Sequence, residues 1–354
     1  MASSNNTLSI SVNLIRFLAW FVPTLGLMFI FHNYLIFWRD WPGTLVLIQN
    51  WQTSDAQPLA ESLRMRGWLQ IASWFVLAIV ITFYLRRRQH TSLRSDADRL
   101  GAIAAFIVRG CFWGLVLIGI VDIVISFLRV EEWLSIFVGE DMAKSLGRPI
   151  FRGTYVHYPL LVLGLVIAFF TRSLGFIWLT LMVVLSEFSI VISRFVYSYE
   201  QPFQGDLVRF WYAGLFLFAS AYALVSEGHV RVDVLYTNFS KKGKAWANTV
   251  GVILLGLPLC WVILITGMWG KGSSLNSPLL SFEIYQQGFG MYVKYLMVGF
   301  MVIFSISMLF QFCSYLLSNV ADLVGEPSSE DEENNGADPS STVSNVSTGN
   351  GFSG

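Results

Sequence analysis

The sequence predicts an all-α polytopic membrane protein with about eight transmembrane helices, and three observations lead to this fold class. Of its 354 residues, 55% are hydrophobic and 13% are charged, whereas a soluble domain typically carries about 25% charged residues. The mean hydropathy is +0.58. The apolar residues also form long uninterrupted blocks, and a helix needs about 20 such residues to cross a bilayer. A single soluble core is therefore excluded.

Eight segments are long and apolar enough to be predicted as spans. In chain order they are residues 16–38, 68–86, 101–128, 154–171, 174–197, 207–227, 247–270 and 291–318. The stretch "MASSNNTLSISVNLIR" before the first span lacks a positively charged region and a small-residue cleavage site, which favours a retained span over a signal peptide. Only "TRS" separates the fourth span from the fifth, which predicts a tight turn.

The sixth span has recognisable start and stop signals. Asp206 and Arg209 open it three residues apart, and the acid suits the free N–H groups at a helix N-terminus. Gly228 suits the left-handed backbone position that ends many helices.

The basic residues near the span ends predict the orientation. The clusters Arg86–Arg88 and Lys241–Lys244 fall on one side when eight spans are threaded, and such clusters face the cytoplasm. Both termini are then cytoplasmic. Aromatic residues beside the outer loops are expected at the headgroup level. They are Trp38, Trp41, Trp51, Trp68, Tyr285, Tyr292 and Tyr295.

Three segments outside the spans differ in composition from ordinary connecting loops. Residues 129–147 and 277–290 mix apolar with polar residues, so they are expected either to lie flat on the membrane or to form ordinary surface loops. All 23 Lys and Arg residues precede residue 326, and the acidic sequence from 326 to 354 has almost no apolar residues. The tail, residues 321–354, is therefore expected to be disordered and cytoplasmic.

Four charged residues within spans are singled out as candidates, because a charge costs about 2.5–3.5 kcal/mol at the bilayer centre on insertion scales. They are Arg109, Asp122, Glu187 and Arg194. Asp122 and Arg194 lie near span ends and are expected to reach water. Glu187 lies deeper, which favours a helix–helix contact within a complex, with an ion path as the alternative.

No enzyme motif is recognised in the sequence. A phosphate-binding glycine loop, a metal-spaced His and Cys cluster and a nucleophile elbow are all missing. His32 and His157 lie in or near spans and are interpreted as packing or interface residues. We therefore expect no catalytic, cofactor-binding or metal-binding residue, no enzymatic activity and no nucleic-acid partner.

The stretch "GHVRVDVLY" (228–236) alternates polar and apolar residues just where the sixth span ends. Such alternation is typical of extended structure. His229, Arg231 and Asp233 are expected on one side of it, in contact with lipid headgroups or with a partner subunit. The lysines of the following loop attract anionic lipid by about 1 kcal/mol each.

Residues 174–320 resemble the small membrane subunit (DctQ type) of tripartite ATP-independent periplasmic, or TRAP, transporters. The resemblance rests on the run "ISRFVYSYEQPFQGDLVRFWYAGLFLFASAYALVSEGHVRVDVLY" and on the basic "SKKGKAW" loop that follows it. It implies a four-helix unit, a large permease subunit as partner and a periplasmic solute-binding protein that delivers the solute. Such transporters use an ion gradient and typically import an organic acid.

The resemblance leaves residues 1–173 as an N-terminal extension of about four spans, and an independent eight-span carrier or channel stays open as the alternative function. Seven residues are the candidate contacts to a subunit or to headgroups. They are Glu187, Arg194, Asp206, Arg209, His229, Arg231 and Asp233.

Overall fold

The computed structural model describes residues 2–52, 60–172, 176–225, 236–285 and 290–327. Helices joined by short loops make up this part of the chain, and no strand occurs in it. The elements are α1 (Ala2–Trp38), α2 (Thr44–Gln52), α3 (Glu61–Arg87), α4 (Leu93–Val130), α5 (Leu134–Val138), α6 (Glu140–Leu146), α7 (Pro149–Arg152), the π-turn η1 (Gly153–His157), α8 (Tyr158–Phe170), α9 (Phe176–Val196), α10 (Pro202–Val225), the 3₁₀ turn η2 (Tyr236–Asn238), α11 (Lys241–Gly251), the π-turn η3 (Val252–Gly256), α12 (Leu257–Met268), α13 (Asn276–Ser281) and α14 (Lys294–Val324).

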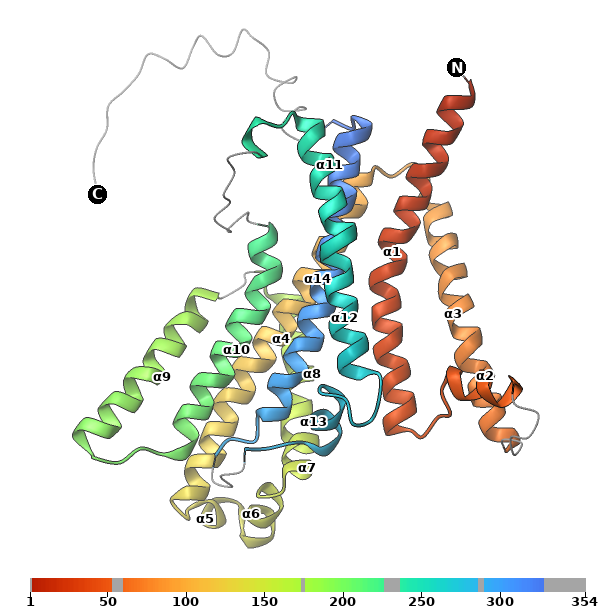
Figure 1. Ribbon diagram of the computed structural model, residues 1–354. Coiled ribbons are helices and arrows are strands. Elements are labelled where there is room, and N and C mark those ends of the chain that lie inside the picture. The colour runs from red at the N-terminus through yellow and green to blue at the C-terminus, as the bar shows by residue number, and fades with distance from the viewer. Residues whose placement is uncertain (1, 53–59, 173–175, 226–235, 286–289, 328–354) are drawn as a thin grey trace, which may run out of the picture.

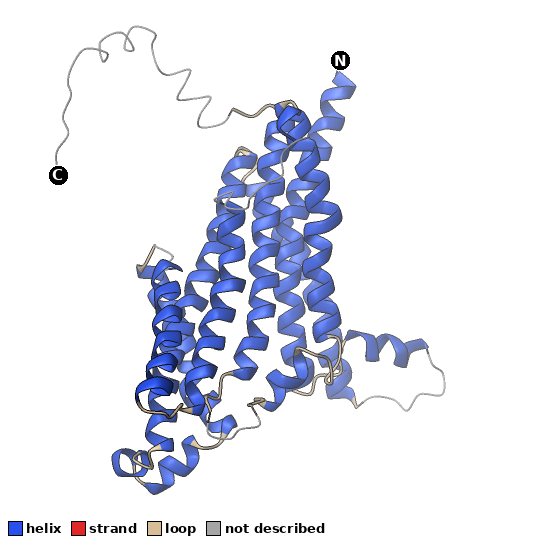
Figure 2. Cartoon of the chain, turned by 60° about the vertical axis from the view of Figure 1, so that its left-hand side comes forward, coloured by secondary structure: helices blue, strands red, loops and turns tan. Residues whose placement is uncertain are grey.

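The long helices run along one bundle in alternating directions (Figure 1). α1 begins and α14 ends at the same end of this bundle, as Figure 2 also shows. We call this end, near Leu93 and Val324, the terminal end. The opposite end, near Val130 and Lys294, is the loop end, where α5, α6 and α13 lie. The all-α polytopic fold expected from the sequence is confirmed.

Seven described segments are long and apolar enough to cross a membrane. They are Val12–Trp38, Glu61–Arg87, Leu93–Val130, Pro149–Phe170, Ile177–Val196, Lys241–Met268 and Lys294–Val324. The sixth expected span corresponds to α10, a helix of 24 residues that is not among the seven. Its first turns contain Gln204, Asp206 and Arg209, which lower the hydropathy of its described part.

α14 is the central helix of the bundle. It packs against α1, α4, α10, α11 and α12, and 61% of its most apolar window is buried, the largest fraction among the seven segments. α3, α8 and α9 form an outer layer, packing on α1, α4 and α10 respectively. Helices from before and after residue 174 therefore share one core around α14.

Glycines allow a close approach between α4 and α8. Gly110 and Gly114 lie four residues apart on α4, the small-xxx-small spacing of close membrane-helix contacts. A Cβ atom on Gly164 of α8 would lie 2.4 Å from the Gly114 backbone nitrogen and 2.8 Å from the Gly110 carbonyl oxygen. Only a residue without a side chain fits at position 164, and α8 is thereby held directly against α4.

Each π-turn ends two residues before a proline. Pro159 follows η1 and Pro258 follows η3. Proline has no N–H to donate to the carbonyl four residues earlier, and a wider turn is one way in which a helix continues past it. These two segments thus stay helical across the bundle despite their prolines.

Candidate functional site

A cluster of buried polar side chains lies at the loop end, where α4 ends and α14 begins. α4 contributes Asp122, Ser126 and Arg129, and α7 and η1 contribute Arg152 and His157. The loop 290–293 and the first turn of α14 contribute the remaining members. They are Gly290, Met291, Tyr292 and Tyr295. We call this group the loop-end junction.

Asp122 is the centre of the loop-end junction. Its side chain is fully buried, and Oδ1 lies 2.9 Å from His157 Nε2 and 3.2 Å from Arg152 Nε. The second oxygen, Oδ2, accepts the Tyr292 backbone N–H over 2.9 Å. The expectation that Asp122 reaches water near a span end is therefore wrong. The Asp122 carboxylate is instead enclosed by partners from three segments.

His157 links Asp122 to Tyr295. Its Nδ1 atom lies 2.8 Å from the Tyr295 hydroxyl, while Nε2 faces Asp122. Both rings are buried, with 0% of His157 and 1% of Tyr295 exposed. π-turns are found often at functional positions, and His157 closes the turn η1. The result is a continuous polar chain from α4 through η1 to α14.

Two arginines enclose the ring of Tyr292. The guanidinium carbons of Arg129 and Arg152 lie 4.7 and 4.5 Å from its centroid, within cation–π range. Arg129 also contacts the Tyr292 hydroxyl, which donates to the Gly147 carbonyl over 2.9 Å. Tyr292 and Tyr295 are thus buried by protein rather than exposed to lipid, at a helix end where aromatic residues are also expected at the headgroup level. The aromatic pattern alone does not distinguish the two locations.

Arg152 is fully buried and depends on few partners. Its Nη1 donates to Ser126 Oγ over 3.4 Å, and Nη2 has no hydrogen-bond partner in the described part of the chain. Asp122 is its ion-pair partner. Compensation of the buried guanidinium charge therefore rests mainly on Asp122.

Asp206 and Arg209 lie beside this junction on α10. The helix begins at Pro202, so Asp206 is within its second turn rather than at its start. The Asp206 carboxylate is buried and accepts the Met291 backbone N–H over 3.1 Å. Arg209 lies 3.7 Å from it and points outward, near the ring of Tyr285. Burial, reinforced by the Asp206 charge, raises the pKa of the Tyr285 hydroxyl.

The remaining candidates within the described residues, Glu187 and Arg194, are not brought to the loop-end junction. Glu187 is exposed on α9. Arg194, also on α9, forms an ion pair with Glu200 in the following loop. His229, Arg231 and Asp233 lie outside the described residues. The described candidates are thus divided between α10, where Asp206 is buried and Arg209 is exposed, and an exposed face of α9.

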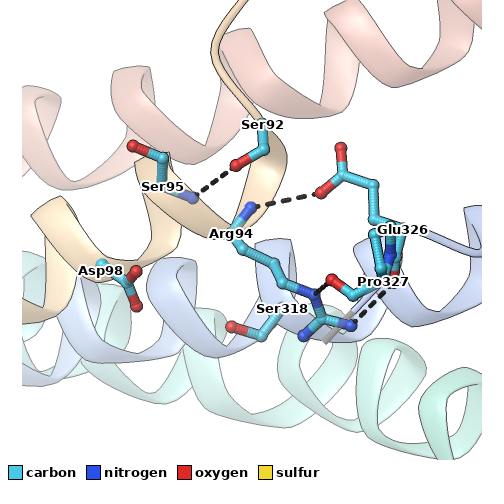
Figure 3. Close-up of a pocket in the computed structure, with 7 residues that line it drawn as sticks. All are labelled: Ser92, Arg94, Ser95, Asp98, Ser318, Glu326 and Pro327. Atoms are coloured by element: carbon cyan, nitrogen blue, oxygen red, sulfur yellow. Dashed lines mark hydrogen bonds between the residues drawn. The ribbon is translucent and has the colours of Figure 1, made fainter. Parts of the chain in front are cut away.

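A second polar contact lies at the terminal end and joins α14 to α4 (Figure 3). Glu326, just after α14, accepts the backbone N–H groups of Leu93 over 3.1 Å and of Arg94 over 3.4 Å. A carboxylate at a helix N-terminus satisfies free N–H groups and interacts favourably with the helix dipole. The Arg94 guanidinium of α4 in turn forms an ion pair with Asp322 of α14 over 2.6 Å. Beside it is an open polar pocket of about 470 Å³.

The polar contacts at these two sites mainly hold helices together. Within the described residues, no group of three or more His, Cys, Asp or Glu side chains could hold a metal ion. Buried ion pairs lose hydration, so they persist where geometry and further hydrogen bonds compensate. Asp122 meets this condition through Arg152, His157 and the Tyr292 amide. The loop-end junction thereby joins α4 and η1 to α14, with α10 beside it. Sequence reasoning identified Asp122 but missed Arg152, although Arg152 and His157 lie close together at the start of a span.

Part of the chain matches a known protein family. Residues 181–321 match the model of the DctQ component of tripartite ATP-independent periplasmic transporters, which confirms the resemblance found in the sequence. No curated protein and no solved structure matched the chain. The matched segment includes Asp206, Tyr292 and Tyr295, whereas Asp122 and Arg152 precede it. The loop-end junction therefore connects the matched segment to the sequence before it.

Proposed function

We propose that this chain is the small accessory permease subunit of a TRAP-type secondary transporter, which uses an ion gradient to import a small organic acid. The observation that carries the proposal is the family match, which extends from α9 to α14. The proposed role is scaffolding and docking rather than solute binding. The large permease subunit would hold the solute and ion sites, and a periplasmic binding protein would deliver the solute.

We propose three regions for this subunit: a membrane extension (1–173), a small-subunit-like four-helix unit (174–320) and an acidic cytoplasmic tail (321–354). The contacts of α4 with α14 and the loop-end junction support a bracing role for the extension. A brace of this kind fits a subunit that must keep one shape while its partner moves. The extension then needs no transport site of its own.

The distribution of basic residues supports an inner-membrane location with both termini in the cytoplasm. Arg86 and Arg87 end α3 and Arg88 follows it at the terminal end, and Lys241–Lys244 begin α11 at that same end. Clusters of Lys and Arg next to spans favour the cytoplasmic side. The membrane lipids of that leaflet are then further partners of these cations.

Reporter fusions test this orientation. Fusions after Gln89 and after Gly325 are expected to report cytoplasm, because both positions lie at the terminal end. A fusion after Lys144, in the segment between α4 and α8, serves as the control and is expected to report periplasm. A periplasmic signal from either of the first two fusions would contradict the orientation.

Co-purification tests the proposed function itself. The tagged full-length chain, extracted from membranes in mild detergent, is expected to recover the large TRAP-type permease subunit of the same organism. An unrelated membrane protein with the same tag serves as the control. If the chain recovers no more large subunit than this control does, the accessory-subunit proposal is wrong.

A further inference from the structure

α9 lies at the edge of the bundle and packs mainly against α10 (Figure 1). Leu179 and Ser186, seven residues apart, are buried and mark its inward face. The opposite side is exposed along the whole helix. Most of α9 is therefore available to lipid or to a partner.

A regular row of residues follows the edge of this exposed side. Its members recur at spacings of four and three residues, all are exposed, and we call them the α9 seam. They are Thr180, Val184, Glu187, Val191 and Arg194. Alternation of four and three residues is the pattern of helices that pack along each other at a small crossing angle.

Glu187 is the unusual member of the α9 seam. It lies ten residues from Ile177 and nine from Val196, the two ends of this span, which places it about 14–15 Å from either end at 1.5 Å per residue. Within the described part of the chain it has no hydrogen-bond or ion-pair partner. A charged side chain that faces lipid at this depth is strongly unfavourable. We therefore expect a partner to cover the α9 seam and shield Glu187 from lipid.

Other exposed helix faces lack this feature. α3 has no charged residue between Ile71 and Leu85, although Phe75 and Ile79 are 66% exposed. The segment from Val252 to Met268 likewise has no charged residue. These faces have the composition of lipid-facing surfaces, and the α9 seam does not.

We infer that the α9 seam binds a transmembrane helix of the large permease subunit that places a basic side chain or another hydrogen-bond donor opposite Glu187. This inference rests on the proposed function. A second copy of this chain is a poor occupant, because two copies share one membrane orientation. A symmetric pair would then bring two Glu187 carboxylates together at the same depth, where like charges repel.

Two matched substitutions test the α9 seam by co-purification. Val184 and Val80 are both 56% exposed, the first in the seam and the second on α3. Val184→Trp is expected to lower recovery of the large subunit by about tenfold or more, because overpacking disrupts a close helix contact. The Val80→Trp variant is expected to recover as much of the large subunit as the wild-type chain does.

Glu187 variants separate a docking role from a structural one. Glu187→Leu is expected to lower recovery by about threefold or more, since it leaves a partner's polar group without its acceptor in the membrane. Glu187→Gln still accepts a hydrogen bond, so it is expected to lower recovery of the large subunit less than Glu187→Leu does. The yield of the chain expressed alone should be unchanged or higher for Glu187→Leu, because a charge facing lipid has been removed.

The outcomes distinguish the inference from the proposed function. A photo-activated cross-linking residue at Val184 should capture the large subunit, and one at Val80 should not. If wild type recovers the large subunit and both Val184→Trp and Glu187→Leu do so equally well, the α9 seam is not the docking surface. Capture of a second copy at Val184 would also overturn the inference. If wild type itself recovers no large subunit, the proposed function fails and this inference fails with it.

Discussion

Liposomes that contain only this chain are expected to take up no solute above the level of empty liposomes, whatever ion gradient is imposed. The reason is the placement of the two acids that an independent eight-span carrier would use. Asp122 is enclosed by Arg152, His157 and the Tyr292 amide. Glu187 is exposed on α9. An ion path needs polar groups that converge on one route, and these two acids lie in different environments.

The measurement requires a known solute. A panel of small organic acids is first screened against the partner binding protein by thermal shift, and the acid that stabilises it is used in radiolabelled form. Liposomes that contain the chain and the large subunit, supplied with the binding protein and a sodium gradient, are expected to take up this acid. Omission of the chain should reduce uptake to background. Uptake by the chain alone would contradict the accessory role and favour the independent carrier.

Asp122→Leu is expected to lower the free energy of unfolding by about 3–5 kcal/mol, the range found when one partner of a buried ion pair is removed. Arg152 would then be a buried guanidinium without a counter-ion, because Asp122 is its ion-pair partner and its side chain is 0% exposed. The nearby Arg129, on the same Tyr292 ring, adds a like charge. The loss can be measured by denaturant titration of the purified protein in detergent.

Two further variants make this prediction specific. Asp122→Leu combined with Arg152→Met is expected to be more stable than Asp122→Leu alone, because both charges have been removed. Glu140→Gln breaks the pair of Glu140 and Lys144, whose side chains are 80% and 73% exposed, and is expected to change stability by about 0–1 kcal/mol. An Asp122→Leu effect as small as that of Glu140→Gln would show that Arg152 does not depend on Asp122.

The sequence by itself determined the fold class and most of the spans. Hydropathy is a local property, because a helix that faces lipid satisfies its own backbone hydrogen bonds within a stretch of about 20 residues. The resemblance to the DctQ component was likewise carried by one continuous run, and the family match to residues 181–321 confirmed it. The apolar run at 207–227 also predicted the span that corresponds to α10, although Asp206 and Arg209 lower the hydropathy of that helix.

Only the tertiary structure decided which polar residues meet. Asp122 and the Tyr292 amide are 170 positions apart, and His157 and Tyr295 are 138 apart. No local pattern relates such pairs, because their contact depends on how α4, η1 and α14 pack. The same packing decided that Asp122 is enclosed while Glu187 faces outward, although both are single acids in apolar helices. A charge in a span must be compensated, but whether the chain itself or a partner provides the compensation depends on which side of the helix the bundle covers.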